Sequence, residues 1–261
     1  MTDTEFVPSA SDAPVLQLAG IAKSFGGVQA LSDVSFEVSR GEVVALVGDN
    51  GAGKSTAVKI ISGNLTPDSG EVFVNGDPVS FSGPQEASER GIATVYQDLA
   101  LCDNLNSVAN LFLGQELRRR FPPRLKRTQM EKAAKEIFAQ MNLRVPSFRS
   151  PVARMSGGER QAIAISRVLL QSPSVIVLDE PTAALGVAQR KQVIGLIERL
   201  REQQKAVLLI SHDLADVKHV SDRVVVFRLG RVAGIFRRGE YTTEQLVAAI
   251  TGAHSWAESK G

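Results

Sequence analysis

Short apolar runs, separated by longer segments of mixed polarity, characterise much of the chain. Three uninterrupted runs have the length of a strand: Val43 to Val47, Val175 to Leu178 and Ala206 to Ile210. RQAIAISRVLLQ precedes the second run and QRKQVIGLIERLREQQ the third, and both segments are predicted helices. Continuous apolar strands alternating with helices are typical of a parallel sheet that helices cover on both faces. The pattern therefore predicts an α/β fold.

The N-terminal part of the chain, residues 15–98, is rich in predicted strands. VLQL, SFEV, GEVVALVG and GIATVYQ are strand-like, and EVFVNGDPV contains Asn75-Gly76 between β-prone residues. Asn-Gly between such residues is a strong hairpin signal. Near the C-terminus, RVVVF and RVAGIF flank Leu229-Gly230 and form a last predicted strand pair, before a short helix that begins near TTEQLVAAITG.

The middle of the chain shows helical spacing instead. QMEKAAKEIFAQMNL places Met130, Ala134, Ile137, Phe138 and Met141 on one helical face, which predicts a small helical subdomain.

These patterns together divide the chain into a domain and two tails. We expect a disordered tail over 1–14, a domain over 15–251 and a C-terminal tail over 252–261. Within the domain, the expected core is 15–98 and 161–251, and the expected helical subdomain is 99–160.

Composition narrows the class of protein. The 261 residues are 43% hydrophobic and 5% aromatic, enough for one sizeable core. The longest apolar runs fall far short of the ~18 residues that span a bilayer, and MTDTEFVPSASDAP has no apolar centre and fails as a signal peptide. Cys102 is the single cysteine, which excludes an internal disulfide, and a net charge of +2 is too small to imply a nucleic-acid partner.

The basic residues are unevenly distributed. RRRFPPRLKR, residues 118–127, carries six of them together with two prolines. A solvated loop is the favoured interpretation, and contact with lipid headgroups or with an acidic partner face is the alternative.

GDNGAGKST, residues 48–56, follows the strand VVALV and precedes the helical stretch AVKIISG. Gly48, Gly53, Lys54 and Ser55 satisfy G-x-x-x-x-G-K-[ST] in the strand-loop-helix context that this motif requires. Glycines let the backbone wrap a phosphate with its N–H groups inward, and the helix N-terminus favours an anion. The motif predicts nucleoside triphosphate binding by Gly48, Asp49, Asn50, Gly51, Ala52, Gly53, Lys54, Ser55 and Thr56.

SVIVLDEPTAALG, residues 174–186, ends an apolar strand in two adjacent acids, Asp179 and Glu180. An acid at the end of a buried strand costs free energy unless it is paired. If this strand ends beside the phosphate loop, Asp179 can hold Mg²⁺ together with Ser55, while Glu180 polarises the attacking water. The alternative is a charge pair at the N-terminus of a following helix.

MSGGERQ, residues 155–161, decides which kind of nucleotide protein this is. It resembles the L-S-G-G-[QE] signature of the ATP-binding cassette (ABC) ATPases, and no N-K-x-D guanine-reading motif occurs. The resemblance extends from Val15 to about Thr251 and includes Gln97 in VYQDLA and His212 in SHD, in the family's order. It implies a P-loop NTPase (RecA-like) core with a parallel sheet, an N-terminal antiparallel β-subdomain and an inserted helical subdomain.

The resemblance also implies roles for particular residues. Phe25 would stack on adenine, although an ordinary buried Phe is a serious alternative. Gln97 would reach Mg²⁺ and the attacking water, and His212 would contact the γ-phosphate and position the water with Glu180. The signature residues would cover ATP held by a second cassette, so that two chains pair head to tail; these residues are Ser156, Gly157, Gly158 and Glu159.

The gap between Gln97 and Ser156 has no room for a long coiled coil, and the chain carries one cassette. The motor subunit of a transporter is therefore favoured, and GDNGAGKST, GIATVYQDLALCDNLNSVANLFLGQEL and EPTAALGV look like cassettes of ribose-, xylose- and fructose-type sugar importers. The implied partners are transmembrane permease subunits and a periplasmic sugar-binding protein. The resemblance places the cassette itself at the cytoplasmic face of the inner membrane. A nucleotide-binding interaction module and an ABC ATPase for a non-sugar substrate remain alternatives. The resemblance also implies that most cassette ATPases have Asp where this chain has Gly186. A feature shared with the sugar-importer cassettes is the favoured interpretation, and weaker communication between the two ATP sites is the alternative.

Overall fold

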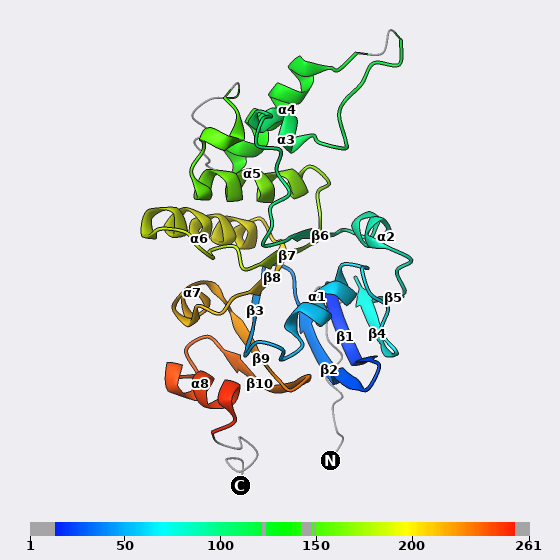
Figure 1. Ribbon diagram of the computed structural model, residues 1–261, viewed down its shortest axis with the longest axis vertical. Helices are drawn as coiled ribbons and strands as arrows, with labels where there is room; N and C mark the ends of the chain where they lie inside the picture. The colour runs from blue at the N-terminus through cyan, green and yellow to red at the C-terminus, as the bar shows by residue number, and fades with distance from the viewer. Residues whose placement is uncertain (1–13, 122–123, 142–147, 149, 254–261) are drawn as a thin grey trace, which may run out of the picture.

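A six-stranded sheet forms the centre of the computed structural model, which describes residues 14–121, 124–141, 148 and 150–253 (Figure 1). Its strand order is β10-β9-β3-β8-β7-β6, with the first pair antiparallel and the remaining neighbours parallel. The predicted parallel α/β sheet is therefore confirmed. The strands are β3 (Val43–Gly48), β6 (Ile92–Val95), β7 (Val175–Asp179), β8 (Ala206–Ile210), β9 (Arg223–Arg228) and β10 (Arg231–Arg237).

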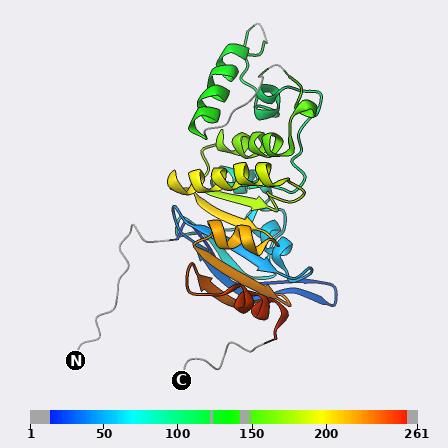
Figure 2. The ribbon, with the colours of Figure 1, turned by 90° about the vertical axis from the view of Figure 1, so that its left-hand side faces the viewer.

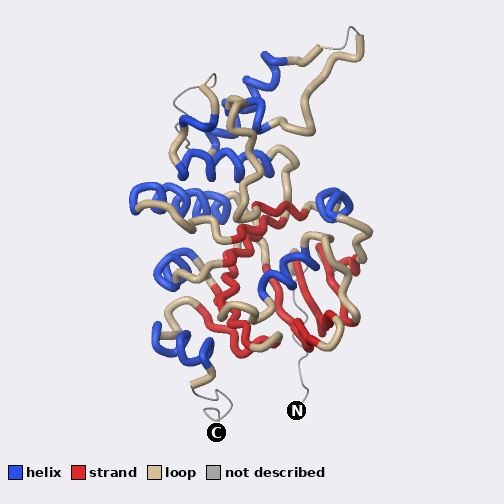
Figure 3. Tube along the Cα trace, in the orientation of Figure 1, coloured by secondary structure: helices blue, strands red, loops and turns tan. Residues whose placement is uncertain are grey.

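Helices occupy the connections between these strands and follow the last one, and Figure 3 shows them around the central strands. They are α1 (Lys54–Ile61), α2 (Pro84–Glu89), α3 (Ser107–Leu111), α4 (Arg127–Gln140), α5 (Gly157–Leu169), α6 (Val187–Glu202), α7 (Leu214–Val220) and α8 (Thr243–Thr251), with a 3-10 turn at Val152–Arg154. None of the helices in the described ranges is both long and apolar enough to cross a membrane.

A second sheet lies against one face of the first. It is antiparallel, in the order β2-β1-β4-β5, and consists of β1 (Leu16–Phe25), β2 (Val28–Val38), β4 (Ser69–Val74) and β5 (Asp77–Val79). Val74 pairs with Asp77 across Asn75 and Gly76, whose φ angles of 52° and 86° are those that a tight hairpin turn requires. The predicted hairpin and the predicted antiparallel β-subdomain are both present.

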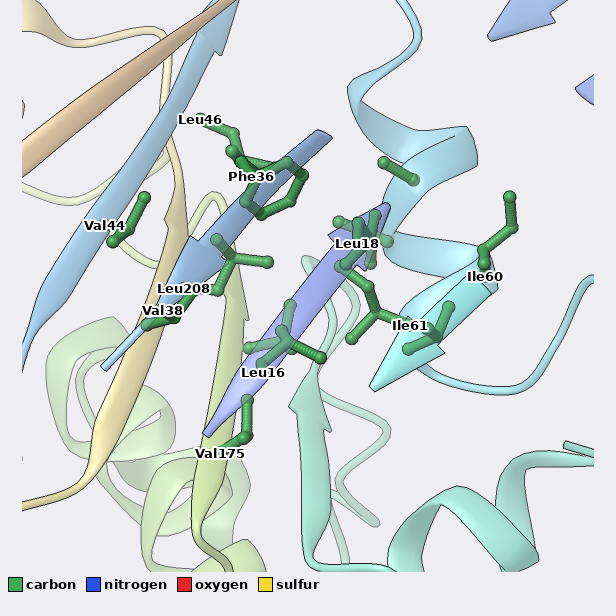
Figure 4. Close-up of a cluster of buried hydrophobic side chains, with 14 of the residues drawn as sticks. Leu16, Leu18, Phe36, Val38, Val44, Leu46, Ile60, Ile61, Val175 and Leu208 are labelled. Carbon is green, nitrogen blue, oxygen red and sulfur yellow. The ribbon is translucent and has the colours of Figure 1, made fainter. Parts of the chain in front are cut away.

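The side chains of the central strands alternate between two cores. Val175 and Val177 of β7 pack with the antiparallel sheet and α1, and Figure 4 shows this core around Leu16, Phe36 and Ile61. Ile176 and Leu178 point to the opposite face, where they pack with residues of α5 and α6. Because both faces are covered, every residue from Val175 to Leu178 is fully buried, which explains the continuous apolar run.

Helices α3, α4 and α5 form a layer beyond α6 (Figure 2). Of the predicted apolar face of α4, Met130, Ala134 and Phe138 are buried and Ile137 is partly buried, while Met141 directly after the helix is fully buried. The boundary expected at residue 160 falls within α5, and the division into subdomains stays a prediction. The two expected tails lie mostly outside the described residues.

Candidate nucleotide-hydrolysis site

The strand order brings the predicted site residues to one edge of the sheet. β8 lies between β3 and β7, and Ile210 at its end pairs with Leu46 of β3 and with Asp179 of β7. The phosphate loop follows β3, His212 follows β8, the acid pair ends β7 and Gln97 follows β6. All four segments thus meet at the carboxyl ends of parallel strands, the edge where open α/β sheets bind ligands.

Backbone geometry explains the glycines of the phosphate loop. At Gly48, with φ of 150°, a Cβ atom would collide with the carbonyl oxygen of Phe227. At Gly53, with φ of 107°, it would lie 2.7 Å from a methyl group of Leu31 and 2.8 Å from Ala30 O. The loop therefore needs glycine at both positions to turn from β3 into α1. Gly53 is the N-cap of α1 and provides no side-chain cap, so the first N–H groups of the helix are free to face a phosphate.

Lys54 is held against the loop that precedes it. Its ammonium group donates hydrogen bonds to Gly48 O at 2.7 Å and to Asp49 O at 2.9 Å. Burial lowers the pKa of Lys54, while the neighbouring carboxylates of Glu180, Asp49 and Asp179 oppose this shift. Lys54 thus lies within the electrostatic range of both predicted acids.

Asp179 experiences the opposite balance. Burial raises the pKa of the Asp179 carboxyl, the charge of Glu180 raises it further, and Lys54 only partly compensates. The negative charge at this position is therefore disfavoured in the protein alone, and an additional cation beside it would relieve the cost.

Glu180 and His212 form a direct pair across the ends of β7 and β8. His212 Nδ1 lies 2.7 Å from Glu180 Oε2, and the Glu180 side chain is 16% exposed whereas that of His212 is 73% exposed. Glu180 has a φ of 51°, which is unusual for a non-glycine residue, and its N–H donates to Ile210 O at 2.9 Å. The main chain thus turns the carboxylate toward His212, in the arrangement of a base oriented by a partner.

A cavity of ≈ 280 Å³ lies between the phosphate loop and the acid pair, and His212 is not among its lining residues. Residues of the phosphate loop from Asn50 to Thr56 line it together with Gln97, Asp179 and Glu180. Phe25 does not line it: its ring is at the end of β1, 51% exposed, with Lys23 Nζ 5.9 Å from the ring centroid. An exposed ring excludes the alternative of an ordinary buried Phe, and adenine stacking stays a prediction.

Three of the cavity residues carry the oxygens predicted to hold the metal. Ser55, Gln97 and Asp179 offer a hydroxyl, an amide carbonyl and a carboxylate, which are hard ligands of the type that Mg²⁺ prefers. The raised pKa of Asp179 has the cause that a bound cation would offset. The residues therefore fit a Mg²⁺ ion.

The signature opens a helix, as predicted, but it lies outside this cavity. Ser156 is the N-cap of α5 and accepts a hydrogen bond from Glu159 N at 3.3 Å, while Ser156 N donates to the Glu159 carboxylate at 2.7 Å. Gly157 lines a separate cavity of ≈ 410 Å³, and Gln97 and Glu180 line both cavities. The signature of one chain thus does not cover its own phosphate loop.

The signature glycines pack closely against the segment that follows the acid pair. A Cβ atom on Gly157 would lie 2.7 Å from a methyl group of Leu185, and one on Gly158 would lie 3.0 Å from Gln189 Cβ. Gly186 between them has an extended backbone, with φ of −69°, and caps α6. Its N–H donates to the side-chain oxygen of Gln189 at 3.2 Å. The start of α5 and the start of α6 are therefore in direct contact.

An ion-pair cluster near the site was not predicted from the sequence. Arg190 of α6 forms ion pairs with Asp213 and, at 2.9 Å from Nε to Oδ2, with Asp216. Asp213 follows His212 directly and caps α7 by accepting from Ala215 N and Asp216 N. The capping signal of Asp213 before Leu214 is visible in the sequence, whereas its pairing with Arg190 depends on how α6 and α7 pack.

Known proteins resemble this chain over most of its length. The fructose import ATP-binding protein FrcA of Rhizobium meliloti is 40% identical over 246 residues, which cover 92% of this chain and 95% of the relative. The xylose/arabinose import ATP-binding protein XylG of Sulfolobus acidocaldarius is 39% identical, covering 91% of this chain and 94% of the relative. A ribose import ATP-binding protein, RbsA 1 of Burkholderia thailandensis, is 39% identical and is covered over 47% of its own length.

Solved structures show the same fold. The ADP conformation of MJ1267, an ATP-binding cassette of an ABC transporter, matches with a TM-score of 0.78 and 26% identity, covering 92% of this chain and 95% of the other. A dimeric post-hydrolysis state of the cassette MJ0796, bound to ADP and Pi, matches with a TM-score of 0.72 and 25% identity, covering 87% and 100%. The family model described as ABC transporter matches residues 31–183. With more than half of its residues in that match and the motifs in place at one sheet edge, the chain belongs to the ABC transporter family as an ATP-binding cassette.

Proposed function

We propose that this chain is the ATP-hydrolysing subunit of a bacterial ABC importer and energises the uptake of a sugar. The observation that carries the hydrolytic part is the Glu180–His212 pair, at 2.7 Å, beside a cavity that the phosphate loop also lines. A carboxylate held by a second group next to bound phosphates is placed to polarise a water for in-line attack. This arrangement favours an enzyme over a nucleotide-binding interaction module.

The chain supplies the remaining parts of phosphoryl transfer from its own residues. The N–H groups of the loop and of the α1 N-terminus face the triphosphate, and the Lys54 ammonium offsets its charge. Gln97 and His212 orient the water that Glu180 polarises. Ser55, Gln97 and Asp179 would hold Mg²⁺, which would neutralise charge that develops on the phosphate oxygens.

A second copy of the chain completes the site. Signature residues of the same chain lie outside the phosphate cavity, yet the N-terminus of α5 carries N–H groups suited to a phosphate. We infer that the Ser156–Glu159 segment of one chain covers the ATP held by the other, in a head-to-tail homodimer. The dimeric state of the similar cassette MJ0796 supports this arrangement.

The transport role rests on the relatives. FrcA and XylG match nearly end to end and are named as import proteins for fructose and for xylose or arabinose. A pentose or hexose is therefore the proposed substrate class, with fructose as one candidate. We propose that the cassette pair lies at the cytoplasmic face of the inner membrane, where it binds transmembrane permease subunits that receive the sugar from a periplasmic binding protein.

Glu180→Gln tests the assigned base. The substitution keeps the shape of the side chain but removes the carboxylate, so ATP binding is expected to remain while hydrolysis falls by at least about a hundredfold and the dimer becomes long-lived with ATP. Nucleotide affinity, phosphate release and size-exclusion chromatography measure the three effects. Lys54→Ala is the contrasting variant and should lose affinity instead. A Glu180→Gln protein that hydrolyses ATP at the parental rate would show that Glu180 is not the base.

Stimulation by sugar tests the transport role. The chain is co-purified with its permease and binding protein, reconstituted in proteoliposomes, and assayed for phosphate release with a panel of pentoses and hexoses. At least one sugar should stimulate the ATPase through the binding protein. The sugar-loaded binding protein favours one conformation of the permease, and in that conformation the two cassettes close on ATP. Omitting the binding protein is the control. An ATPase that responds to no membrane protein would exclude the transporter interpretation.

Asp179→Asn separates stability from metal binding. Because burial and Glu180 disfavour the charge of Asp179, the neutral amide should raise the melting temperature of the nucleotide-free protein. ATP is expected to raise the melting temperature more in Mg²⁺ than in EDTA. The same variant should lose most of this Mg²⁺-dependent difference. Thermal scans with ATP, in EDTA and in Mg²⁺, measure both effects.

The control for this experiment is Asp68→Asn. A hydrogen bond from Lys23, with one from Ser24 N, lowers the pKa of Asp68, so the neutral variant should not gain stability. If Asp179→Asn, like Asp68→Asn, did not raise the melting temperature of the nucleotide-free protein, the electrostatic account of Asp179 would be contradicted.

Gly186→Asp tests whether the missing acid weakens the coupling of the two ATP sites. The extended backbone accepts any residue, and an added Cβ would have only the Gln189 side-chain oxygen nearby, at 4.0 Å. Asp caps helices better than Gly by a few tenths of a kcal/mol and Ala caps them worse. Gly186→Asp should therefore keep or slightly raise the melting temperature, and the control Gly186→Ala should slightly lower it. We expect the Hill coefficient of hydrolysis to stay unchanged; a changed coefficient in the Asp variant alone would assign a coupling role to this position.

A further inference from the structure

A basic, antiparallel segment projects from the layer that contains α3 and α4. We define the basic arm as residues 117–121 and 124–127. Its two halves are joined by backbone hydrogen bonds from Lys126 N to Leu117 O at 2.7 Å and from Arg119 N to Arg124 O at 2.8 Å, and Arg118 pairs with Leu125. Figures 1 and 2 show the arm at the end of the molecule opposite α8. These hydrogen bonds fix the direction in which its side chains project.

The positive charge of the arm is almost uncompensated. Arg118 lies 3.1 Å from Glu116, and the other basic side chains of the arm form no ion pair within 4 Å among the described residues. Five arginines elsewhere in the described chain lie within 4 Å of a carboxylate, whereas others there, such as Arg228 and Arg231, do not; the paired ones are Arg160, Arg190, Arg201, Arg223 and Arg238. The arm therefore carries six basic residues and no carboxylate, with Glu116 just before it as the one ion-pair partner among the described residues. It creates a local positive field, although the net charge of the whole chain is only +2.

Apolar side chains are exposed among these charges. Phe121 is 91% exposed, the largest exposed fraction among the large apolar residues of the described chain, and Leu117 and Leu125 are 38% and 43% exposed. Neither the fold nor the ATP site explains an aromatic ring held in water. An aromatic ring beside arginines is, however, the composition of a segment that inserts at a membrane interface, with the ring at the acyl boundary and the guanidinium groups on the headgroup phosphates.

We propose that the basic arm binds anionic lipid headgroups directly, with Phe121 inserted among them. A protein partner is the less suitable occupant, because a stable protein interface buries about 800 Å² on each side, whereas the arm stands clear of the neighbouring helices and offers a narrow edge. Anionic lipids satisfy many arginines at once without a fixed register. This contact orients the helical layer toward the membrane independently of ATP hydrolysis.

Vesicle binding of the full chain tests the proposal. The purified protein is sedimented with vesicles of phosphatidylcholine alone or of phosphatidylcholine with phosphatidylglycerol, at low and at physiological salt. Binding should require phosphatidylglycerol and should weaken as salt screens the charges. The triple variant Arg118→Gln, Arg119→Gln, Arg120→Gln should bind the anionic vesicles roughly a hundredfold more weakly, and Phe121→Ser should weaken binding at equal charge.

The control variant removes the same charge at the far end of the molecule. Arg228, Arg231 and Arg237 are exposed on β9 and β10, and replacing all three by Gln should leave vesicle binding and basal ATPase activity unchanged. The arm variants should also keep basal ATPase activity, so a failure of lipid binding leaves the proposed ATPase function intact. Equal binding to neutral vesicles, or an equal loss in the control, would overturn the proposal.

A third measurement separates lipid from protein as the occupant. Inner-membrane vesicles are used before and after their proteins have been digested, and the parental chain should bind both through the arm. Binding that disappears with the digested protein would assign the arm to a protein partner and overturn the lipid proposal.

Discussion

Two carboxylates at the end of one buried strand impose the constraint on which the site depends. Asp179 and Glu180 are adjacent, partly buried and mutually repulsive, and Lys54 provides the nearest compensating charge. The remaining balance comes from geometry. Glu180 adopts a φ of 51° and lies 2.7 Å from His212, so this acid has a second partner in addition to the Lys54 charge that it shares with Asp179. The protein alone leaves Asp179 with a raised pKa, which makes this edge of the sheet a place for a further cation and for the triphosphate that accompanies it.

The same edge is connected to the signature surface, which we propose meets a second chain. Glu180 and Gln97 line the phosphate cavity and also the cavity beside the signature. Three residues after its cap Gly186, α6 carries Gln189, which packs against the signature. The next residue, Arg190, pairs with Asp213 beside His212. A shift of α6 therefore reaches both the signature and the residue beside His212, because close packing leaves little room for independent movement. This connection is built from ordinary packing and one ion-pair cluster.

The sequence predicted the elements and most of the chemistry, and it left the spatial order open. Gly48 to Thr56, the acid pair and the signature are local motifs whose physical reasons lie within a few residues of one another. Strand order is different: nothing local states that β8 lies between β3 and β7, and only this order brings His212 to Glu180. The short helices α2, α3 and α7 escaped prediction because their few residues show little periodicity, and Arg190 is recognisable only after α6 and α7 are packed. Phe25 illustrates a different case: the sequence allowed both adenine stacking and an ordinary buried Phe, and only the half-exposed ring of the structure excludes the second.

The fold of the monomer does not explain why residue 186 is glycine. Glycine is needed where φ is positive or where a Cβ would collide, as at Gly48 and Gly53. Neither condition holds at Gly186, whose backbone is extended and whose surroundings are open. The fold of the monomer therefore tolerates the aspartate that the family resemblance implies for most cassette ATPases, and it would gain a better helix cap from it. Since folding does not require glycine at this position, its reason lies outside the fold of the monomer, either in a contact with the second chain that we propose or in an absence of selection on this loop.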